Sequence, residues 1–297
     1  MAASRLLAVR AFAKINLTLS VLGLRRDGYH ELRTVFQSLA LHDTLTFSRA
    51  AGPFTISCNE PSCPVDRTNL IWRAAEQVWA DARRRGLPRG VAVRLQKRIP
   101  VQAGLGGGSS DAAAAIRGLA AFWRVRLTPD RLQAIAAALG ADVPFFLGGG
   151  TSLGVERGDV LFPLTDVRPA WVVLAVPGFG VSTADAYRWW DEQQERNRAS
   201  AGTRAACVAP EFELHNDLEG PVARHHREIA RLVKALHHAG AARAAMSGSG
   251  PVVFGLFRTR EAAAAAARSL ARPGRRVLVT RTLSRPRFRA LAAPRSP

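Results

Sequence analysis

The sequence predicts a mixed fold of β-strands and α-helices, arranged as one large domain or two ordinary ones. Three observations lead to this prediction. Residues 6–57 contain alternating apolar stretches, residues 69–85 repeat apolar side chains at helical spacing, and residues 171–280 alternate short apolar runs with helical segments. The 297 residues are 47% hydrophobic and 22% charged, which is typical of a chain that folds around a real core.

The first half begins with strands and continues with helices. Strands are expected at 6–22, where 15–21 alternates clearly, and then at 29–41, 44–47, 54–57 and 91–95. Helices are expected at 69–85 and 111–123. A further helix begins at Thr128–Asp130, where a threonine N-cap precedes a proline in the first turn. Three glycines at 148–150 end this unit.

A stretch bounded by Pro163 and Pro169 separates the halves, so the expected domains are residues 1–165 and 166–297. In the second half, strands are expected at 171–176, 252–257 and 277–280, helices at 185–195, 228–239 and 261–270, and a polar loop at 198–209. The segment from Asp191 to Pro210 is interpreted as a polar insertion.

A glycine-rich run from Pro100 to Asp111 lies between an expected strand and an alanine-rich helix. Four of the five residues from Gly104 to Gly108 are glycine, which permits positive φ angles and lets backbone N–H groups converge on one point. Ser109 and Ser110 add hydroxyls near the positive end of the helix dipole. A flexible linker would not be entered by a strand and followed by a capped helix. The run therefore predicts a site for an anion such as the phosphates of a nucleotide.

Three segments together resemble the GHMP kinases, a family named for galactokinase and the homoserine, mevalonate and phosphomevalonate kinases. The phosphate loop of this family is similar to Pro100–Ser110, its first motif to Ala13–Leu17, and its third motif to Met246–Pro251. The resemblance extends from about Ala11 to Phe257. It implies an α+β GHMP kinase fold, with an N-terminal half like ribosomal protein S5 domain 2, a ferredoxin-like C-terminal half, and a site between them.

Other segments resemble one branch of the family, whose members phosphorylate the 2-hydroxyl of a cytidine diphosphate sugar alcohol in the non-mevalonate route to isoprenoids. These segments are Arg26–Leu32, Thr68–Ile71, Gly140–Phe146 and His215–Glu219. The alternatives are another GHMP kinase of the homoserine or mevalonate type and, outside the family, a basic nucleic-acid-binding protein.

The resemblance implies that ATP is the phosphoryl donor. Its phosphates would be held by Gly104, Leu105, Gly106, Gly107, Gly108, Ser109 and Ser110. Its adenine would be lined by Lys97, Asn69, Leu70 and Ile71, of which the last two also fit the buried face of their helix. Mg²⁺ would share the phosphate charge and retain waters, without a dedicated set of protein ligands. Asp111 either reaches a metal-bound water or, as we favour, stabilises the helix dipole.

Asp142 is the candidate catalytic base. Its apolar neighbours suggest partial burial, and because a buried lone carboxylate is costly, a cationic partner is expected. The resemblance supplies Lys14 as that partner. Together the two side chains would orient the acceptor hydroxyl, take its proton and stabilise developing negative charge. The alternative is an ion pair with a purely structural role.

The resemblance also implies the residues that bind the acceptor. Asn16 would hydrogen-bond to it, Tyr29 would stack on the cytosine, and His30 would bind the base edge through a ring nitrogen or its backbone. Tyr187 or the nearby Phe179 would cover the other face of the base. Ser247, Gly248, Ser249 and Gly250 would lie near the acceptor phosphates, although a tight turn alone would also explain these small residues.

The net charge of +19 requires an explanation. Only three of the 42 basic residues are lysines, and nine arginines but no acids follow from Arg268 onward, which we interpret as a basic tail. Because no nucleic-acid-binding motif accompanies the charge, we expect small-molecule substrates and neither a nucleic acid nor a membrane as partner. Three cysteines without metal-ligand spacing, and no visible secretory signal, favour a cytoplasmic protein.

Overall fold

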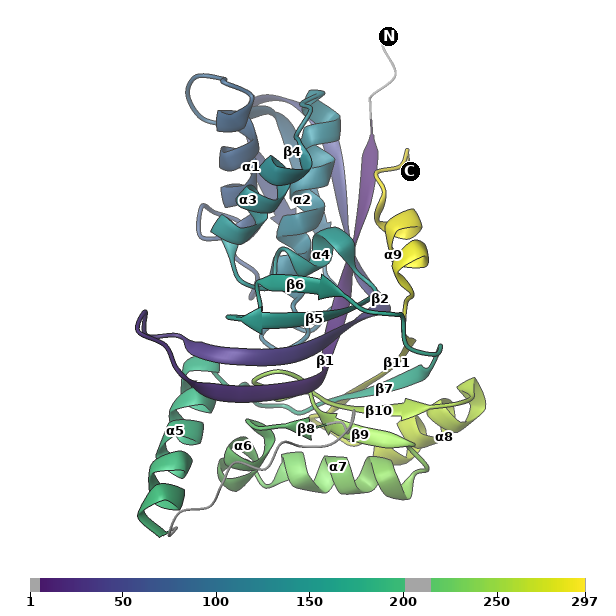
Figure 1. Ribbon diagram of the computed structural model, residues 1–297. Helices are drawn as coiled ribbons and strands as arrows, with labels where there is room; N and C mark the ends of the chain where they lie inside the picture. Colours follow the sequence, from purple (N-terminus) through teal and green to yellow (C-terminus); the bar gives the residue numbers. More distant parts are fainter. Residues whose placement is uncertain (1–5, 201–214, 297) are drawn as a thin grey trace.

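The computed structural model describes residues 6–200 and 215–296 and contains two β-sheets with helices packed against them (Figure 1). The first sheet has seven strands, in the order β3-β4-β2-β1-β8, with β5 paired to β2 and β6 paired to β5. These strands are β1 (Leu7–Leu24), β2 (His30–Pro53), β3 (Thr55–Cys58), β4 (Arg89–Gln96), β5 (Thr151–Glu156), β6 (Val160–Pro163) and β8 (His215–Asn216). The second sheet has four strands in the order β11-β7-β10-β9, namely β7 (Trp171–Val176), β9 (Arg243–Met246), β10 (Val253–Phe257) and β11 (Arg276–Arg281).

The helices of the first half are α1 (Leu70–Asp81), α2 (Gly107–Trp123), α3 (Pro129–Leu139) and α4 (Phe145–Gly148). Those of the second half are α5 (Thr183–Ser200), α6 (Glu219–His225), α7 (Glu228–His238), α8 (Arg260–Leu270) and α9 (Arg285–Ala292). The alanine-rich α2 is buried along Ala112–Ala115, and a Cβ on its Gly118 would lie 2.3 Å from the Phe47 ring of β2. Small side chains therefore let this helix pack directly on the first sheet.

The long antiparallel pair of β1 and β2 organises the first sheet, with Leu7 opposite Phe47 at one end and Leu24 opposite His30 at the other. The sequence predicts a gap between two strands at residues 42–43, but β2 continues through it. The gap closes because Asp43, fully buried, accepts hydrogen bonds from the backbone N–H groups of residues 98 and 99 in the neighbouring chain segment. Aspartate is disfavoured in strands, but here the hydrogen bonds to its carboxylate compensate for its burial within β2.

The two halves share a buried core. Ile15 and Leu39 of the first sheet pack in one cluster with Val172, Leu174 and Phe254 of the second. Helices α7 and α8 cover the other face of the second sheet (Figure 1). The change of sheet falls between β6 and β7, yet β8, from the second half of the chain, pairs with β1. The halves are therefore held together by both packing and strand pairing.

Several elements differ from those that the sequence predicts. Helix α2 begins at Gly107 and not near Asp111, with Gly106 as a left-handed N-cap. Helix α5 extends through residues 198–200, which the sequence assigns to a loop, and the rest of that loop lies outside the described residues. Strands β5, β6, β8 and β9 and helices α4 and α6 are short elements that were not predicted from the sequence.

The sequence suggests that the arginine-rich C-terminus is an appended tail. This prediction is wrong, because the segment forms α9 and packs against β1. Phe288 of α9 is 1% exposed and lies in a cluster with Phe12 and Leu283. Arg285 donates hydrogen bonds to the backbone carbonyls of Gly149, Thr151 and Leu164 at 3.2, 2.5 and 3.3 Å. The C-terminal arginines therefore include one that joins the two halves of the fold.

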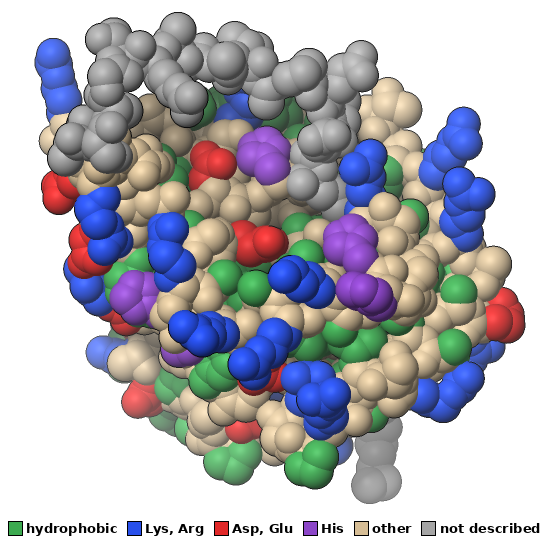
Figure 2. Space-filling model, turned by 90° about the horizontal axis from the view of Figure 1, so that it is seen from below, with side chains coloured by type: hydrophobic (Ala, Val, Ile, Leu, Met, Phe, Trp, Pro, Cys, Tyr) green, Lys and Arg blue, Asp and Glu red, His purple; other side chains and the backbone are tan. Residues whose placement is uncertain are grey.

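Basic side chains are scattered over the face that Figure 2 shows, with acidic side chains among them. In the described part of the chain, no helix is both long and apolar enough to span a bilayer.

Candidate active site

A cavity of about 1250 Å³ lies between the two halves. Its walls come from β1, β2, the phosphate loop, the turn after α3, the beginning of α5 and the loop after β9. The predicted site residues that line it are Lys14, Asn16, Tyr29, His30, Gly104, Gly106, Ser109, Asp142, Tyr187, Gly248, Ser249 and Gly250. The three motifs, far apart in the sequence, therefore meet at one cavity.

The phosphate loop enters α2 through two glycines in the left-handed region. Gly104 has a φ of +72° and Gly106 a φ of +68°. A Cβ on Gly104 would lie 2.4 Å from the carbonyl oxygen of Ser247, and one on Gly106 would lie 2.6 Å from the ring of Phe146. Conformation and space thus both require glycine. No side chain of the described residues caps α2, so its first backbone N–H groups are available to an anion.

The buried hydroxyl of Ser247 connects the three motifs. It donates a hydrogen bond to the Gly104 carbonyl at 3.1 Å and accepts one from the backbone N–H of Asn16 at 3.3 Å. These contacts join the third motif to the second and the first. Hydrogen bonds within the protein therefore hold the three motifs in fixed relative positions.

Lys14 is the enclosed cation of the cavity. Its ammonium lies 3.5 Å from Oδ2 of Asp142 and donates a hydrogen bond to Oδ1 of Asn16 at 2.7 Å. The Asn16 amide donates in turn to Oγ1 of Thr34 at 2.7 Å. The Lys14 side chain is 5% exposed and that of Asp142 is 34% exposed. Asn16 therefore orients Lys14, while the Asp142 carboxylate is open to the cavity; a contact from Asn16 to substrate stays a prediction.

Asp142 lies in the turn between α3 and α4. The adjacent Val143 is buried, as is Phe145 at the start of α4, so the turn is anchored on both sides by the apolar neighbours that the sequence shows. A solvent-accessible carboxylate beside an ammonium can position a hydroxyl and accept its proton.

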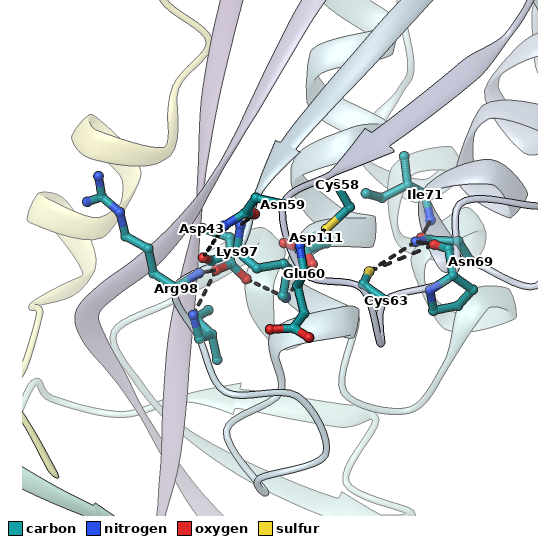
Figure 3. Close-up of polar contacts among 12 residues, drawn as sticks. Asp43, Cys58, Asn59, Glu60, Cys63, Asn69, Ile71, Lys97, Arg98 and Asp111 are labelled. Carbon is teal, nitrogen blue, oxygen red and sulfur yellow. Dashed lines mark hydrogen bonds and ion pairs between the residues drawn. The ribbon is translucent and has the colours of Figure 1, made fainter. Parts of the chain in front are cut away.

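Lys97 occupies a buried charge cluster behind the phosphate loop (Figure 3). Its ammonium contacts the carboxylates of Asp43 and Asp111 at 2.5 and 2.8 Å. Burial raises the pKa of Asp111 to about 8 although Lys97 opposes the shift, and Oδ1 of Asp111 has no hydrogen-bond partner among the described residues. Asp111 therefore pairs with Lys97 in the second turn of α2, and the prediction that it stabilises the helix dipole at the N-terminus is wrong.

The other residues predicted for adenine have structural contacts of their own. Asn69 is the N-cap of α1, accepting a hydrogen bond from the backbone N–H of Ile71 at 2.8 Å, and Ile71 is fully buried. Leu70 is partly buried against the core. None of these residues, nor Lys97, is among those that line the cavity. Their role at an adenine ring stays a prediction.

Two tyrosines line the cavity from different halves, and each ring has one covered face. The Arg157 guanidinium lies 5.2 Å from the centre of the Tyr29 ring. The His30 ring stacks on Tyr187 with centres 4.7 Å apart and planes 22° apart. Both tyrosine rings line the cavity, and their stacking on a base stays a prediction.

Phe179, the alternative to Tyr187, stacks on His226 at 4.4 Å and does not line the cavity. Of the two aromatic candidates, Tyr187 is therefore the one that the fold brings to the site.

Several site residues were not identified from the sequence. Asp191, assigned to an insertion, lines the cavity and lies 2.9 Å from Nε2 of His30. Thr34 orients Asn16, as described above. Asn216 of β8 supports the third motif by donating to the carbonyls of Met246 and Gly248 at 2.9 and 2.8 Å. Only Asn216 had a signal, since it falls within a segment that resembles the family.

The chain is similar to known proteins over most of its length. The GHMP kinases N terminal domain matches residues 69–150, and the GHMP kinases C terminal domain matches residues 204–276. A relative from Moorella thermoacetica named 4-diphosphocytidyl-2-C-methyl-D-erythritol kinase is 44% identical over 289 residues, covering 93% of this chain and 99% of the relative.

Solved structures are similar over the same extent. A crystal structure of 4-(cytidine 5'-diphospho)-2C-methyl-D-erythritol kinase is 34% identical, with a TM-score of 0.76 over 93% of this chain and 98% of that one. A homoserine kinase from Cytophaga hutchinsonii is 17% identical, with a TM-score of 0.66 over 97% of this chain and 96% of that one, and so shows only the shared fold. The predicted α+β GHMP fold is thus confirmed. Together with near-complete coverage at 44% identity, it shows that the chain belongs to the 4-diphosphocytidyl-2-C-methyl-D-erythritol kinase family of the GHMP kinases.

Proposed function

We propose that the protein transfers the γ-phosphoryl group of ATP to the 2-hydroxyl of 4-diphosphocytidyl-2-C-methyl-D-erythritol, forming the 2-phosphate and ADP. The pair of Lys14 and Asp142 carries the proposal, because it shares a cavity with a glycine loop and a helix N-terminus that suit phosphates. Family membership supports ATP as donor and the cytidyl sugar alcohol as acceptor.

Phosphoryl transfer needs positioning and charge neutralisation more than covalent chemistry. In the proposed mechanism, the backbone N–H groups at the start of α2 bind phosphate oxygens of ATP. Asp142 accepts the proton of the acceptor hydroxyl as the hydroxyl oxygen attacks the γ-phosphorus. Lys14 orients the carboxylate and stabilises negative charge on the transferring group, while Asn16 and Thr34 keep its ammonium in place.

Mg²⁺ accompanies ATP in this proposal. Within residues 6–200 and 215–296, no three His, Cys, Asp or Glu side chains are grouped to hold a metal. That is compatible with Mg²⁺, which retains waters and binds largely through substrate phosphates. The Ser109 hydroxyl and the Asp142 carboxylate, both at the cavity, are the oxygen groups that would face it. When bound, the ion neutralises phosphate charge.

The acceptor's cytidine is proposed to bind where Tyr29, His30 and Tyr187 line the cavity. A cavity of about 1250 Å³ exceeds the ~300–1,000 Å³ typical of single-ligand pockets, which supports two large substrates. An acceptor as small as homoserine or mevalonate would leave the aromatic end unused. Both proposed substrates carry several charges and do not cross bilayers unaided, which supports the expectation of a cytoplasmic enzyme.

The test is ADP formation by the purified protein with each of three acceptors, namely the cytidyl sugar alcohol, homoserine and mevalonate. The proposal expects kcat/KM for the cytidyl acceptor to exceed the other two by at least ~10³-fold, because the aromatic end contributes binding only to that substrate. Turnover of homoserine or mevalonate without turnover of the cytidyl acceptor would replace the proposal with the alternative kinase.

A further inference from the structure

The imidazole of His30 is held on three sides by α5. Its ring stacks on Tyr187 at 4.7 Å, meets the edge of Trp190 at 5.7 Å with planes 89° apart, and has Nε2 2.9 Å from Oδ1 of Asp191. The His30 side chain is 11% exposed, whereas that of Asp191 is 42% exposed. His30 begins β2, so these contacts fix an orientation that the strand alone would not determine.

The contact with Asp191 determines which nitrogen of a neutral His30 carries the proton. An ionised carboxylate only accepts hydrogen bonds, so Nε2 must be the donor. In the neutral ring Nδ1 is then an acceptor with a free lone pair. No other described residue forms a hydrogen bond with Nδ1, and His30, Tyr187 and Asp191 all line the cavity. The arrangement therefore offers a fixed acceptor to a ligand.

We propose that Asp191 is a positioning residue that fixes the tautomer of His30, so that Nδ1 accepts a hydrogen bond from the exocyclic amino group of cytosine and the site selects cytidine over uridine. Cytosine has an amino donor at position 4, whereas uracil has a carbonyl acceptor there, which would meet the Nδ1 lone pair. This inference rests on the proposed function and adds to it the source of base selectivity.

A purely structural role would leave base selectivity unaltered. In that case the pair of His30 and Asp191 would only join α5 to the end of the β1–β2 hairpin, and its loss would affect both bases equally. Selection through the tautomer predicts a different result, because loss of the carboxylate lets the ring adopt either tautomer and present a donor to uracil. The ratio of kcat/KM for the cytidyl substrate to that for the uridyl analogue therefore distinguishes a structural role from selection through the tautomer.

The experiment compares kcat and KM of the wild type, Asp191→Asn and Asp191→Glu for the cytidyl substrate and its uridyl analogue, at mildly alkaline pH where free imidazole is neutral. An Asn amide can accept from Nε2–H or donate to Nε2, so Asp191→Asn should lower the cytidyl-to-uridyl ratio of kcat/KM by ~10-fold or more, mainly through KM. Asp191→Glu keeps an acceptor-only group and should retain most of the ratio. Glu195→Gln, an exposed change of the same charge one turn further along α5, should leave it unchanged.

A second measurement keeps the inference testable if Asp191→Asn folds poorly. The ¹⁵N chemical shifts of the His30 ring in the wild type should show a protonated Nε2 and an unprotonated Nδ1. A protonated Nδ1, or an unchanged ratio in a folded Asp191→Asn variant that still turns over the cytidyl substrate, overturns the inference alone. A wild type that does not phosphorylate the cytidyl substrate overturns the proposed function instead.

Discussion

The ammonium of Lys14, on β1, lies 3.5 Å from the carboxylate of Asp142, in the turn after α3. Lys14 is almost enclosed, whereas a third of the Asp142 side chain is exposed to the cavity. An ion pair with a buried member is weak evidence for a stabilising role, because the cost of removing the charge from water offsets the attraction. The position of this pair beside the phosphate loop supports the proposed catalytic role, in which Lys14 stabilises charge and Asp142 accepts a proton.

Lys14→Met should lower kcat by ~10²- to 10³-fold, the usual effect of removing one preorganised charge stabiliser, because Met has a similar length but no charge. Steady-state kinetics with the cytidyl substrate measure this. Lys234→Met, which removes an exposed lysine from α7, is the matched control and should leave kcat unchanged. A Lys14→Met enzyme with near-normal kcat would make the ion pair structural.

Asp111→Asn should change how stability depends on pH. Because burial raises the pKa of Asp111 from 3.8 to about 8, the folded state binds this proton more tightly than the unfolded state does. The contribution is complete below pH 3.8, and the free energy of unfolding then falls as pH rises toward 8. Asn resembles the protonated acid, so Asp111→Asn should remove that decline.

Urea denaturation of both proteins at several pH values in this window checks the prediction. The exposed Asp130→Asn is the control and should follow the wild type. Parallel curves for the wild type and Asp111→Asn would show that Asp111 is ionised at neutral pH in the folded protein.

Phe288→Ala should destabilise the protein by about 3–5 kcal/mol, because the ring is fully buried in a small cluster against β1 and truncation leaves a cavity. Deletion of residues 285–297 should be at least as damaging, since it also removes Arg285. Thermal or urea denaturation measures both. Arg287→Ala changes an exposed residue of the same helix and should have little effect. A stable deletion variant would restore the interpretation of this segment as a dispensable tail.

Tyr187→Ala should raise KM for the cytidyl substrate about 5- to 150-fold and leave kcat and the KM for ATP nearly unchanged, because stacking on a base is the same in the ground and transition states. Tyr187→Phe should be almost silent, since no other described residue hydrogen-bonds to the hydroxyl. Phe179→Ala, which changes a ring that does not line the cavity, serves as control. A KM effect in Phe179→Ala but not in Tyr187→Ala would exchange the two assignments.

Local sequence patterns predicted the parts of the fold that depend on local interactions. The continuous apolar run of β7 and the proline-containing start of α3 are where the sequence indicates them. The start of α2 was misplaced because Gly107 and Gly108, expected in the loop, form its first turn once Gly106 turns the chain. Strand β8 has two residues and exists only through its pairing with β1, so no local pattern could indicate it.

The candidate site follows the same division. The glycine loop is interpretable from its own residues, whereas the pairing of Lys14 with Asp142 was predicted from the family resemblance, and the structure brings all three to one cavity. The residues that orient them were missed, because Thr34 and Asp191 act through partners that are distant in sequence. The burial of α9 was missed for a related reason. Its many arginines suggest a solvated tail, and only the tertiary fold places Phe288 against Phe12.

The most direct test of the central claim is a single-turnover measurement of phosphoryl transfer by Asp142→Asn with ATP and the cytidyl substrate. Asn keeps the size of the side chain but is a far weaker proton acceptor. The account predicts a fold and ATP affinity like those of the wild type, and a transfer step slower by ~10²-fold or more. A transfer rate equal to that of the wild type would contradict the assignment of Asp142 as base and of its pair with Lys14 as the catalytic centre.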